Sequence, residues 1–356
     1  MTADPSLSII IANYNYAAYV GHAIESALAV RCGRREVIVV DDGSTDNSLA
    51  VIGKFEGKIK IIAQPNLGQT QSYRRGFDVS SGDVIIFLDA DDILHPDLMT
   101  EIVKVWHDGI SKIQVQVATI NSEGKAFGGL HPQFHEIPSP QQIRKWALET
   151  GAYPTPAGSG NAYARWFVSR VFQLPTSFVD RANDSYMLAA APFLGDVVTI
   201  AKPLASYRIH GLNQGAQAKL DDARFANEIE RTRRRFAFSM EVAAVSNLRG
   251  DDGALDRNLR FLSLRMTSLC LRPDLHPIAN DARISVLTKM VGALAYPQGF
   301  SRLEGVFLVL WAGIVSVAPS ASARKLISWR YVPQSRPKGF FSVLSKFGVL
   351  RARNSA

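Results

Sequence analysis

Short apolar runs alternate with segments of helical spacing over the first hundred residues. Each run is bounded by polar or turn-forming residues, as buried parallel strands are; the runs cover residues 7–12, 36–40, 58–63 and 83–88. Residues 19–30 and 69–79 place apolar side chains three and four positions apart, which is typical of helices packed through one face. Strands that alternate with helices predict a mostly parallel sheet with right-handed crossovers.

The pattern becomes less regular after this first part. Gly and Pro crowd residues 124–160, so we expect loops there. Residues 162–172 and 185–193 have helical spacing, and residues 197–201 have the composition of a strand.

From about Asp221 the pattern is helical and basic. Residues 1–216 hold 18 Lys and Arg against 21 Asp and Glu, whereas residues 217–356 hold 22 against 11. A positive excess confined to one part of a chain favours contact with an anionic surface. We therefore expect an α/β domain over residues 1–215 and a basic helical region over residues 216–356.

Composition excludes several classes of protein. The chain has 356 residues, of which 47% are hydrophobic and 20% charged, so it is neither disordered nor fibrous. Its two cysteines, Cys32 and Cys270, cannot form a disulfide framework and favour a reducing compartment. The first residues include Asp4 and no basic segment, unlike a secretory signal. We expect a cytoplasmic protein.

Three of the predicted strands end in polar clusters. The clusters are Asn13-Tyr14-Asn15, Asp41-Asp42-Gly43-Ser44 and Asp89-Ala90-Asp91-Asp92. In sheets of this kind ligands bind at the carboxyl ends of the strands. We therefore expect the three clusters to meet at one edge of the sheet and to form a binding site.

The third cluster has the chemistry of a divalent cation site. Asp89, Asp91 and Asp92 repel one another unless a cation joins them. Mg²⁺ and Mn²⁺ prefer oxygen ligands and bind through one or two carboxylates together with substrate phosphates. The alternative is a helix N-terminus that carries acidic residues, which the helix dipole also favours.

The second cluster has two interpretations that can hold together. Asp41 or Asp42 could accept a hydrogen bond from a base imide or a ribose hydroxyl, or the segment could serve as a turn and a helix cap. Tyr14 could stack on a base or belong to the rim of the core. Other chemistries lack their motifs: the chain has no GxxxxGK[ST], HExxH or GxSxG, and no GxGxxG after the first strand.

The C-terminal region contains two apolar segments. Residues 305–318 are fourteen uncharged residues, fewer than the ~20 of a transmembrane helix, so we expect a buried or interfacial helix. Residues 339–353 mix Phe, Val and Leu with Lys and Arg, as in-plane anchors on anionic membranes do. The alternative is a helical subdomain with a solvated basic face. No nucleic acid partner is expected, because the basic residues 231–235 lack a platform of stacking aromatic side chains.

Ordered motifs between residues 7 and 213 resemble family 2 of the glycosyltransferases. They are SIIIANYNYAAYV, VVDDGSTDNS, NLGQTQSYRRGFDVSSGDVIIFLDADD and YRIHGLN. The resemblance implies the α/β GT-A fold of nucleotide-diphospho-sugar transferases, which is a Rossmann-like, mostly parallel sheet flanked by helices. Here a mainly α-helical C-terminal extension would follow it. The family transfers a sugar from a nucleotide-diphospho donor, usually with inversion.

The resemblance also implies roles in donor binding. Asp42, with Asp41, would hold the nucleobase or ribose, and Tyr14 would line the base. Relatives often carry Ala-x-Asn where this chain has Ser72-Tyr73-Arg74, so Arg74 or Arg75 would reach the phosphates. The implied donor site comprises Ala12, Tyr14, Asp41, Asp42, Arg74, Asp89 and Ala90.

Further roles concern the metal, the base and the acceptor. Asp91 and His210 would hold Mn²⁺ or Mg²⁺, with Asp89 and Asp92 as additional candidate ligands. Asp184 stands where the family has a Glu-Asp pair and would be the general base, although Asn183 replaces the first acid. The acceptor side would comprise Gly158, Gly160, Asn161 and Asn183.

These roles predict an inverting, metal-dependent glycosyltransferase of cell-surface glycan or polysaccharide biosynthesis. Its acceptor would be a glycan or a lipid-linked molecule, and the enzyme would be peripheral on the inner face of the membrane. Two alternatives remain. One is a non-catalytic sugar-nucleotide-binding or scaffold protein. The other is a phosphatase of the haloacid-dehalogenase type, whose DxDx[TV] motif VIIFLDADDIL also resembles.

Overall fold

The computed structural model describes residues 4–134, 136–156, 158–174, 183–210, 220–332 and 335–337. The chain divides into two compact units: Met1–Ile143 with Thr155–Ile209, and Arg144–Pro154 with His210–Ala356.

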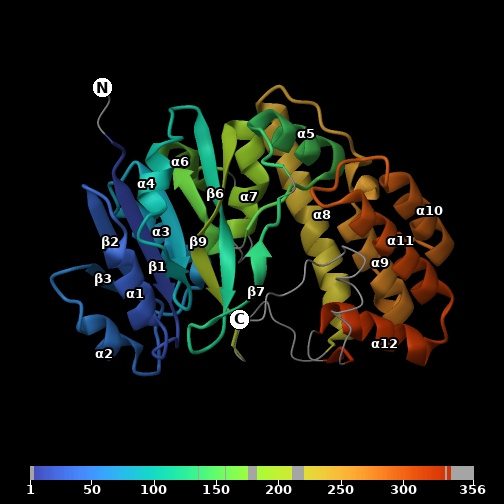
Figure 1. Cartoon of the computed structure of the whole chain (residues 1–356), viewed down its shortest axis with the longest axis horizontal. Helices are drawn as coiled ribbons and strands as arrows, with labels where there is room; N and C mark the ends of the chain where they lie inside the picture. Colours follow the sequence, from blue (N-terminus) through green and yellow to red (C-terminus); the bar gives the residue numbers. More distant parts are fainter. Residues whose placement is uncertain are drawn as a thin grey trace. The chain divides into compact units, whose positions relative to one another are not determined.

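Within the described residues, the first unit contains a nine-stranded sheet with helices on both faces (Figure 1). Its strands are β1 Leu7–Asn13, β2 Arg35–Asp41, β3 Lys60–Ala63, β4 Val84–Asp89, β5 Ile93–Leu94, β6 Ile110–Ile120, β7 Ala126–His131, β8 Asn161–Ala164 and β9 Asp196–Arg208. The strand order is β3-β2-β1-β4-β8-β6-β9-β5, and β7 pairs with β6. The strands from β3 to β4 are parallel, as the apolar runs predict, whereas β8 lies antiparallel between β4 and β6.

Alternate residues of the central strands face opposite helices. The helices of this unit are α1 Val20–Ala29, α2 Ser48–Gly53, α3 Gln69–Asp78, α4 Leu98–Val103, α5 Pro140–Thr150, α6 Arg165–Phe172 and α7 Asn183–Leu194, with α5 extending to the unit boundary and beyond. Ile9 and Ile11 pack in one core with α1, α2 and α4. Ile10 faces α3, where a Cβ on Gly76 would lie 2.3 Å from the Ile10 side chain. Glycine at this position therefore permits the close approach of α3 to the sheet.

Two expectations about secondary structure were wrong, and one strand was not predicted. Residues 110–120 form a strand that apolar-run analysis missed, because Lys112 and Gln114 are polar yet fully buried and hydrogen-bonded. Residues 124–160 contain β7 and α5 in addition to loops. Residues 162–164 belong to β8, so the helix expected over residues 162–172 begins only at Arg165. The strand expected at 197–201 is confirmed and continues to Arg208.

The second unit is helical, as expected. Its elements are α8 Asp222–Val245, η3 Ala254–Arg257, α9 Leu259–Leu271, η4 Pro273–Leu275, α10 Arg283–Ala293, α11 Arg302–Val317 and α12 Ser320–Tyr331. Helix α9 contacts α8, α10, α11 and α12, so it forms the centre of this unit. Residues 305–318 lie almost wholly in α11, one face of which is buried.

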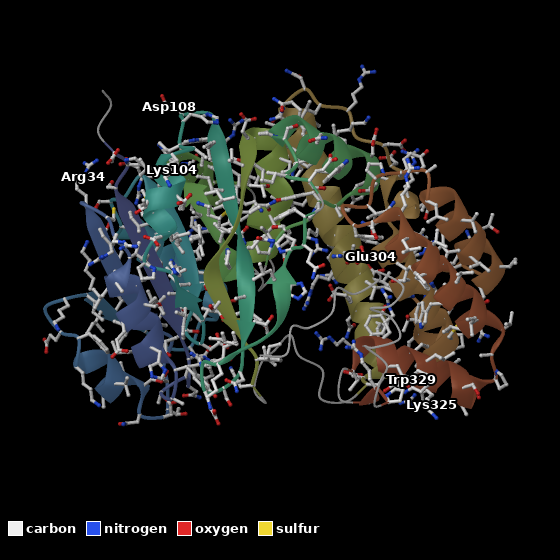
Figure 2. The ribbon with its side chains drawn as sticks, viewed as in Figure 1. Arg34, Lys104, Asp108, Glu304, Lys325 and Trp329 are labelled. Carbon is white, nitrogen blue, oxygen red and sulfur yellow. The ribbon has the colours of Figure 1, made fainter. Side chains whose placement is uncertain are left out.

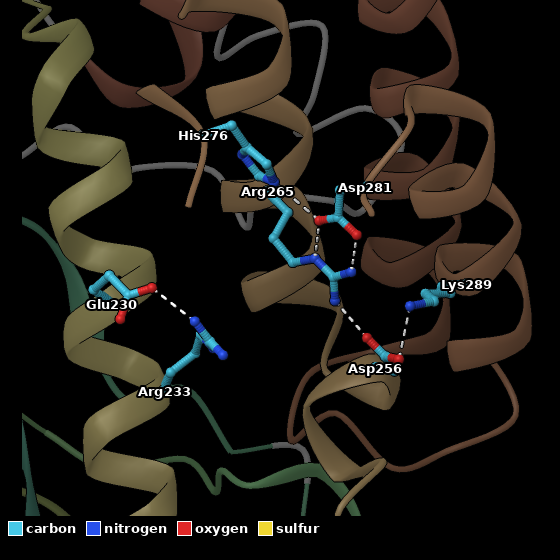
Figure 3. A network of polar contacts seen from close by, with 7 residues as sticks. All are labelled: Glu230, Arg233, Asp256, Arg265, His276, Asp281 and Lys289. Carbon is cyan, nitrogen blue, oxygen red and sulfur yellow. Dashed lines mark hydrogen bonds and ion pairs between the residues drawn. The ribbon is translucent and has the colours of Figure 1, made fainter. Parts of the chain in front are cut away.

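A buried polar network lies beside α9 (Figure 3). The guanidinium of Arg265 donates to the carboxylates of Asp281 and Asp256. His276 Nε2 lies 3.0 Å from Asp281 Oδ2, and Lys289 Nζ lies 2.8 Å from Asp256 Oδ2. Burial would raise the pKa of Asp281, but the hydrogen bonds from Arg265 and His276 outweigh it and lower that pKa. The carboxylates are therefore compensated, as buried charges must be.

Candidate functional site

The polar strand ends meet at one edge of the sheet, as predicted. The register of β1 and β2 places Asn13 opposite Asp41, and the register of β1 and β4 places Ala12 opposite Asp89. Asn13 Nδ2 donates to Asp41 Oδ2 at 2.8 Å. The first and second clusters are therefore in direct contact, and the third begins one strand away.

The loops after β1 and β2 are joined by side-chain hydrogen bonds. Asn15 adopts a left-handed backbone conformation with φ of 57°. Its Oδ1 accepts the Thr45 N–H at 2.7 Å and the Asp46 N–H at 3.2 Å, and the Ala17 N–H donates to Asp46 Oδ2 at 2.9 Å. Asn tolerates the left-handed region better than most residues, so Asn15 suits this junction.

Asp41 and Asp42 are both buried and hold different pieces of backbone at this edge. Asp41 accepts hydrogen bonds from the N–H and hydroxyl of Ser44 at 2.9 and 2.7 Å. Asp42 accepts from the Leu67 N–H at 2.9 Å and from the Gly68 N–H at 2.8 Å. The turn interpretation thus holds for Asp41, whereas Asp42 binds the backbone that leads into α3 and α2 has no side-chain cap. Contact of either carboxylate with a donor stays a prediction.

Asp89 anchors the acidic turn to α3. Its Oδ1 accepts the hydroxyl of Tyr73 at 2.8 Å and the amide of Gln69 at 2.7 Å. A small pocket opens at this carboxylate and is lined by Gln69, Tyr73, Phe87, Asp89, Gly158 and Tyr163. The turn therefore borders a hollow in the first unit.

The next residues of the acidic turn are buried. Ala90, Asp91 and Asp92 are each less than 8% exposed. Burial raises the pKa of Asp92 well above its usual range, and the charges of Asp89 and Asp91 raise it further. Asp92 Oδ1 accepts the N–H of Arg208 at 3.0 Å, whereas the buried Oδ2 has no hydrogen-bond partner.

The carboxylates of this turn raise the pKa of two tyrosines, Tyr16 and Tyr207. Neither was selected as a site residue from the sequence. Burial raises the pKa of Tyr16 to about 12, with further contributions from Asp91, Asp89 and Asp92. Burial likewise raises the pKa of Tyr207 to about 12, and the same three carboxylates add to it. Tyr16 lies within SIIIANYNYAAYV and Tyr207 opens YRIHGLN, so only the motifs themselves pointed to them.

Arg208 is the second feature missed from the sequence. This side chain is 2% exposed, and its Nε donates to the carbonyl of Asp91 at 2.8 Å. Its Nη1 donates to the carbonyls of Asn121 and Ser122 at 3.2 and 3.0 Å. Arg208 therefore fixes the backbone of the acidic turn from the end of β9. The only signal in the sequence was the position of Arg208 within YRIHGLN, two residues before His210.

The predicted acceptor loop is tied to the acidic turn. Gly158 and Gly160 lie in a 3₁₀ turn, η1 Gly158–Gly160, and the hydroxyl of Ser159 accepts the Asp89 N–H at 3.2 Å. Asn161 begins β8, where its Nδ2 donates to the carbonyl of Gly158 at 3.2 Å. The loop thus lies at the same edge of the sheet as Asp89.

A fully buried lysine holds the base of this loop. Lys112 Nζ donates to Gln114 Oε1 at 3.0 Å, to Thr155 Oγ1 at 2.8 Å and to Asn161 Oδ1 at 3.0 Å. Burial lowers the pKa of Lys112 well below its usual range, since the charged ammonium loses its hydration. Asn161, predicted on the acceptor side, therefore has a structural partner within the sheet.

The remaining predicted residues are placed as follows. Tyr14 is 43% exposed, and the guanidinium of Arg74 lies 5.5 Å from the ring centre of Phe172. His210 is half-buried and comes two residues after β9. Asn183 and Asp184 begin α7, and their side chains lie outside the described residues. Their chemical roles stay predictions.

The acidic turn suits a divalent cation in its chemistry. It offers oxygen ligands only, and the buried Asp92 Oδ2 has no partner. The described residues contain no group of three or more His, Cys, Asp and Glu side chains arranged around a common point. Mg²⁺-type sites commonly use one or two carboxylates and complete their shell with substrate phosphates and water. The residues present therefore fit a cation that binds together with a phosphorylated ligand.

The architecture of the first unit defines the class of its fold: it is the GT-A fold found in glycosyltransferases. In the search of solved structures, residues 1–349 of Staphylococcus aureus TarS, in complex with UDP-GlcNAc, align with a TM-score of 0.53 over 91% of each chain, at 14% identity. This likeness shows the fold alone.

The sequence comparisons identify the family. Residues 8–172 match the profile of "Glycosyl transferase family 2". An uncharacterized glycosyltransferase of Nostoc sp. is 35% identical over 218 residues, which are 60% of this chain and 67% of that protein. A chondroitin synthase of Pasteurella multocida is 38% identical over 96 residues, 26% of this chain and 10% of that protein. The chain belongs to glycosyltransferase family 2, which decides against the phosphatase alternative.

Proposed function

We propose that this enzyme transfers a sugar from a nucleotide-diphospho-sugar to an acceptor hydroxyl with inversion at the anomeric carbon. The observation that carries the proposal is the acidic turn at the strand edge, with its three carboxylates and the raised pKa of Asp92. Such an excess of negative charge favours a cation-bridged diphosphate, because the cation offsets the repulsion between the carboxylates.

Asp91 and His210 are the proposed ligands of Mn²⁺ or Mg²⁺, with Asp89 and Asp92 as further candidates. When bound, the cation would supply Lewis acidity that neutralises the leaving nucleoside diphosphate. The protein side of this arrangement is positional: Tyr73 and Gln69 orient Asp89, and Arg208 holds the backbone of Asp91.

Asp184 is the proposed general base. It lies in the first turn of α7, next to Asn183. Its carboxylate would accept the proton of the acceptor hydroxyl as that oxygen attacks the anomeric carbon from the face opposite the leaving group. A positioned base of this kind contributes typically ~10²–10⁴-fold to the rate. Inversion follows from a single displacement.

The donor and acceptor would meet between the strand ends and the Gly158–Asn161 loop. Ala12, Tyr14, Asp41, Asp42, Arg74 and Ala90 are proposed on the donor side, and Gly158, Gly160, Asn161 and Asn183 on the acceptor side. The hydrogen bond between Ser159 Oγ and the Asp89 N–H supports this arrangement, because it joins the two sides directly. Holding donor and acceptor close together in the reactive orientation supplies much of the remaining rate enhancement.

The acceptor is proposed to be a growing glycan or a lipid-linked molecule of cell-surface polysaccharide synthesis. A relative named chondroitin synthase supports a glycan product. We also propose that the enzyme works at the inner face of the membrane. None of the described helices is both long enough and apolar enough to cross a bilayer. The anchor predicted at residues 339–353 lies outside the described residues.

Thermal-shift screening of nucleotide sugars, with and without Mn²⁺, tests the donor class. A ligand that binds only the native state raises the melting temperature, and UDP-GlcNAc, which TarS binds, is the first donor to include. We expect at least one nucleotide sugar to stabilise the protein, and more strongly with Mn²⁺. No stabilisation by UDP-, GDP-, dTDP-, ADP- or CMP-sugars would contradict the proposal.

Asp184→Asn then separates catalysis from binding. We expect unchanged donor affinity and a loss of transfer of about 10²–10⁴-fold. Asp108→Asn, an exposed residue before β6, is the control with the same change of charge. Equal transfer by wild type and Asp184→Asn would reject the base assignment, and donor binding without transfer by the wild type would favour the scaffold alternative. NMR of the product must show the anomeric configuration inverted.

A further inference from the structure

Helix α11 is apolar on both of its faces. Its inner face, which includes Leu308, Ala312 and Val315, is buried. Its outer face carries large aliphatic side chains at spacings of three and four residues, which places them in one stripe along the helix. Their exposed fractions are Leu303 46%, Val306 41%, Leu310 57%, Ile314 58% and Val317 83%.

Helix α10, which packs beside α11, also exposes large aliphatic side chains. The two helices contact each other, and Figure 1 shows them side by side. Arg283 Nη1 donates to the carbonyl of Ser316 at 3.2 Å, so the start of α10 lies beside the end of α11. Ile284 and Val291, two turns apart on α10, are 72% and 55% exposed. We call the stripe on α11 together with these two residues the α10–α11 face.

A face of this kind is unusual for a helix pair that meets only water. Residues 305–323 contain no Asp, Glu, Lys or Arg, so no charge interrupts the outer side of α11 after its first turn. A solvent-facing helix normally places polar side chains opposite its buried stripe. Large aliphatic side chains that are exposed in a row along one helix favour a contact with a protein or a membrane.

The charges around the face favour a membrane. Residues 282–332 contain six Lys and Arg and one acid, Glu304; Lys289 pairs with Asp256 and Arg324 with Asp222, and Arg283, Arg302, Lys325 and Arg330 have no carboxylate partner among the ion pairs of the described residues. Glu304 is engaged in the capping box of α11, where its carboxylate accepts the Ser301 N–H at 2.9 Å. Arg283 and Arg302 are the first residues of α10 and α11, and both are exposed. An apolar stripe bordered by cations matches a bilayer with anionic headgroups.

Helix α12 adds the side chains typical of a membrane interface. It contacts α11, and it carries Lys325 and Trp329, with the Lys325 Nζ 5.5 Å from the centre of the Trp329 ring (Figure 2). Tryptophan and lysine are common at the level of lipid headgroups. A second copy of this chain is the weaker candidate, because a self-complementary contact would bring two positively charged borders together.

We propose that the α10–α11 face docks on an anionic lipid bilayer, with α11 lying in the plane of the membrane. This inference deepens the membrane association proposed above by naming the surface that makes the contact. It places the lipid contact in a described, folded helix pair, apart from residues 339–353. The site chemistry of the first unit does not enter the inference.

Co-sedimentation of the full chain with vesicles tests it. Vesicles of phosphatidylcholine alone are compared with vesicles that also contain phosphatidylglycerol. We expect the wild type to prefer the anionic vesicles and to lose affinity as salt is added. Leu310→Gln with Ile314→Gln should weaken binding about tenfold or more, because both side chains leave the apolar contact. Leu49→Gln with Ile137→Gln is the matched control, since these exposed residues lie in the first unit.

Each further outcome decides the proposal. Arg302→Gln should reduce binding to anionic vesicles only. The proposal is overturned if Leu310→Gln with Ile314→Gln binds vesicles as strongly as the wild type does. It is also overturned if vesicle binding is lost in a chain that ends at residue 337 but not in this double variant. A dimer in light scattering that the same double variant dissociates would assign the face to a second copy instead. Donor binding, measured by thermal shift on the same variants, should stay unchanged, so failure here leaves the transferase proposal intact.

Discussion

Removal of the Arg208 guanidinium tests how the acidic turn is held in place. The side chain is buried and donates to the carbonyls of Asp91, Asn121 and Ser122. Its backbone N–H donates to Asp92, and this bond survives any substitution except proline. Arg208→Met therefore deletes the charged donor group while it keeps the apolar stem and the strand.

The magnitude follows from what each carbonyl loses. Asp91 is 7% exposed, so its carbonyl loses a charged hydrogen bond that water cannot readily replace, about 2–3 kcal/mol. Asn121 and Ser122 lie on a more exposed turn, where water can replace the lost donors at little cost. The guanidinium also lies 5.1 Å from the ring centre of Tyr19, a contact worth about 0.5–1 kcal/mol. We expect Arg208→Met to lower the free energy of unfolding by about 2–4 kcal/mol.

Urea unfolding of wild type, Arg208→Met, Arg208→Lys and Lys202→Met measures this effect. Lys202 lies on the same strand, and its exposed ion pair with Glu101 is worth at most about 1 kcal/mol. Arg208→Lys should fall between wild type and Arg208→Met, because one ammonium cannot serve three carbonyls in fixed positions. We also expect Arg208→Met to weaken Mn²⁺-dependent nucleotide binding about tenfold. Stability and binding both equal to those of Lys202→Met would refute the reasoning.

Three further predictions concern buried polar groups. Burial raises the pKa of Glu36, but hydrogen bonds from Lys60, from Ser8 and from both the hydroxyl and backbone of Ser81 outweigh it and bring the pKa to about 2. Solvent screening reduces the effect of this partly exposed carboxylate, which therefore stabilises the fold above pH 4.5 by about 1–2 kcal/mol, and the contribution is lost as pH falls through 2. Urea unfolding should show Glu36→Gln less stable at pH 7, by an amount that narrows with acidification, and a pH-independent difference would contradict this. Lys112→Met should lower the free energy of unfolding by about 1–3 kcal/mol, since Gln114, Thr155 and Asn161 lose their donor. Sugar transfer should slow as the Gly158–Asn161 loop shifts. Unchanged stability would exclude a stabilising role for the Lys112 hydrogen bonds. Arg265→Met should cost about 3 kcal/mol by leaving the buried Asp281 with His276 as its remaining partner (Figure 3). Donor affinity in the folded protein should stay unchanged, as calorimetry can show.

The sequence predicted the first half of the sheet because its strands are buried on both faces. The runs at residues 7–12 and 83–88 are apolar except for Ser8 and Asp83, and they became β1 and β4 within a residue at either end. Their polar ends met at one edge because parallel strands in register must end together. Elements of this kind are encoded locally.

Strands stabilised by buried polar side chains were not predictable in this way. Lys112 and Gln114 give β6 the composition of an exposed segment, and only their partners Thr155, Asn161 and Thr199 make burial possible. These partners are more than forty residues distant along the chain. Tertiary structure therefore overrides the local signal there.

The candidate site shows the same division. Asp89, Asp91 and Asp92 were recognisable because three acids follow an apolar strand. Arg208 and Tyr207 come more than one hundred residues later, and only the antiparallel pairing of β5 with β9 brings them to the acidic turn. Without that pairing, a lone arginine in a strand has no visible partner in the sequence.

Calorimetric titration of the nucleotide that stabilises the protein best, with and without Mn²⁺, tests the central claim most directly. Wild type is compared with Asp91→Asn and with the control Asp108→Asn, which has the same change of charge. Asp108 stands just before β6, at the edge of the sheet opposite to the carboxyl end of β4 (Figure 2). We predict Mn²⁺-dependent binding by wild type and Asp108→Asn, and a loss of about tenfold or more in Asp91→Asn, because a cation ligand is removed. Mn²⁺-dependent binding of equal strength in Asp91→Asn would contradict the account.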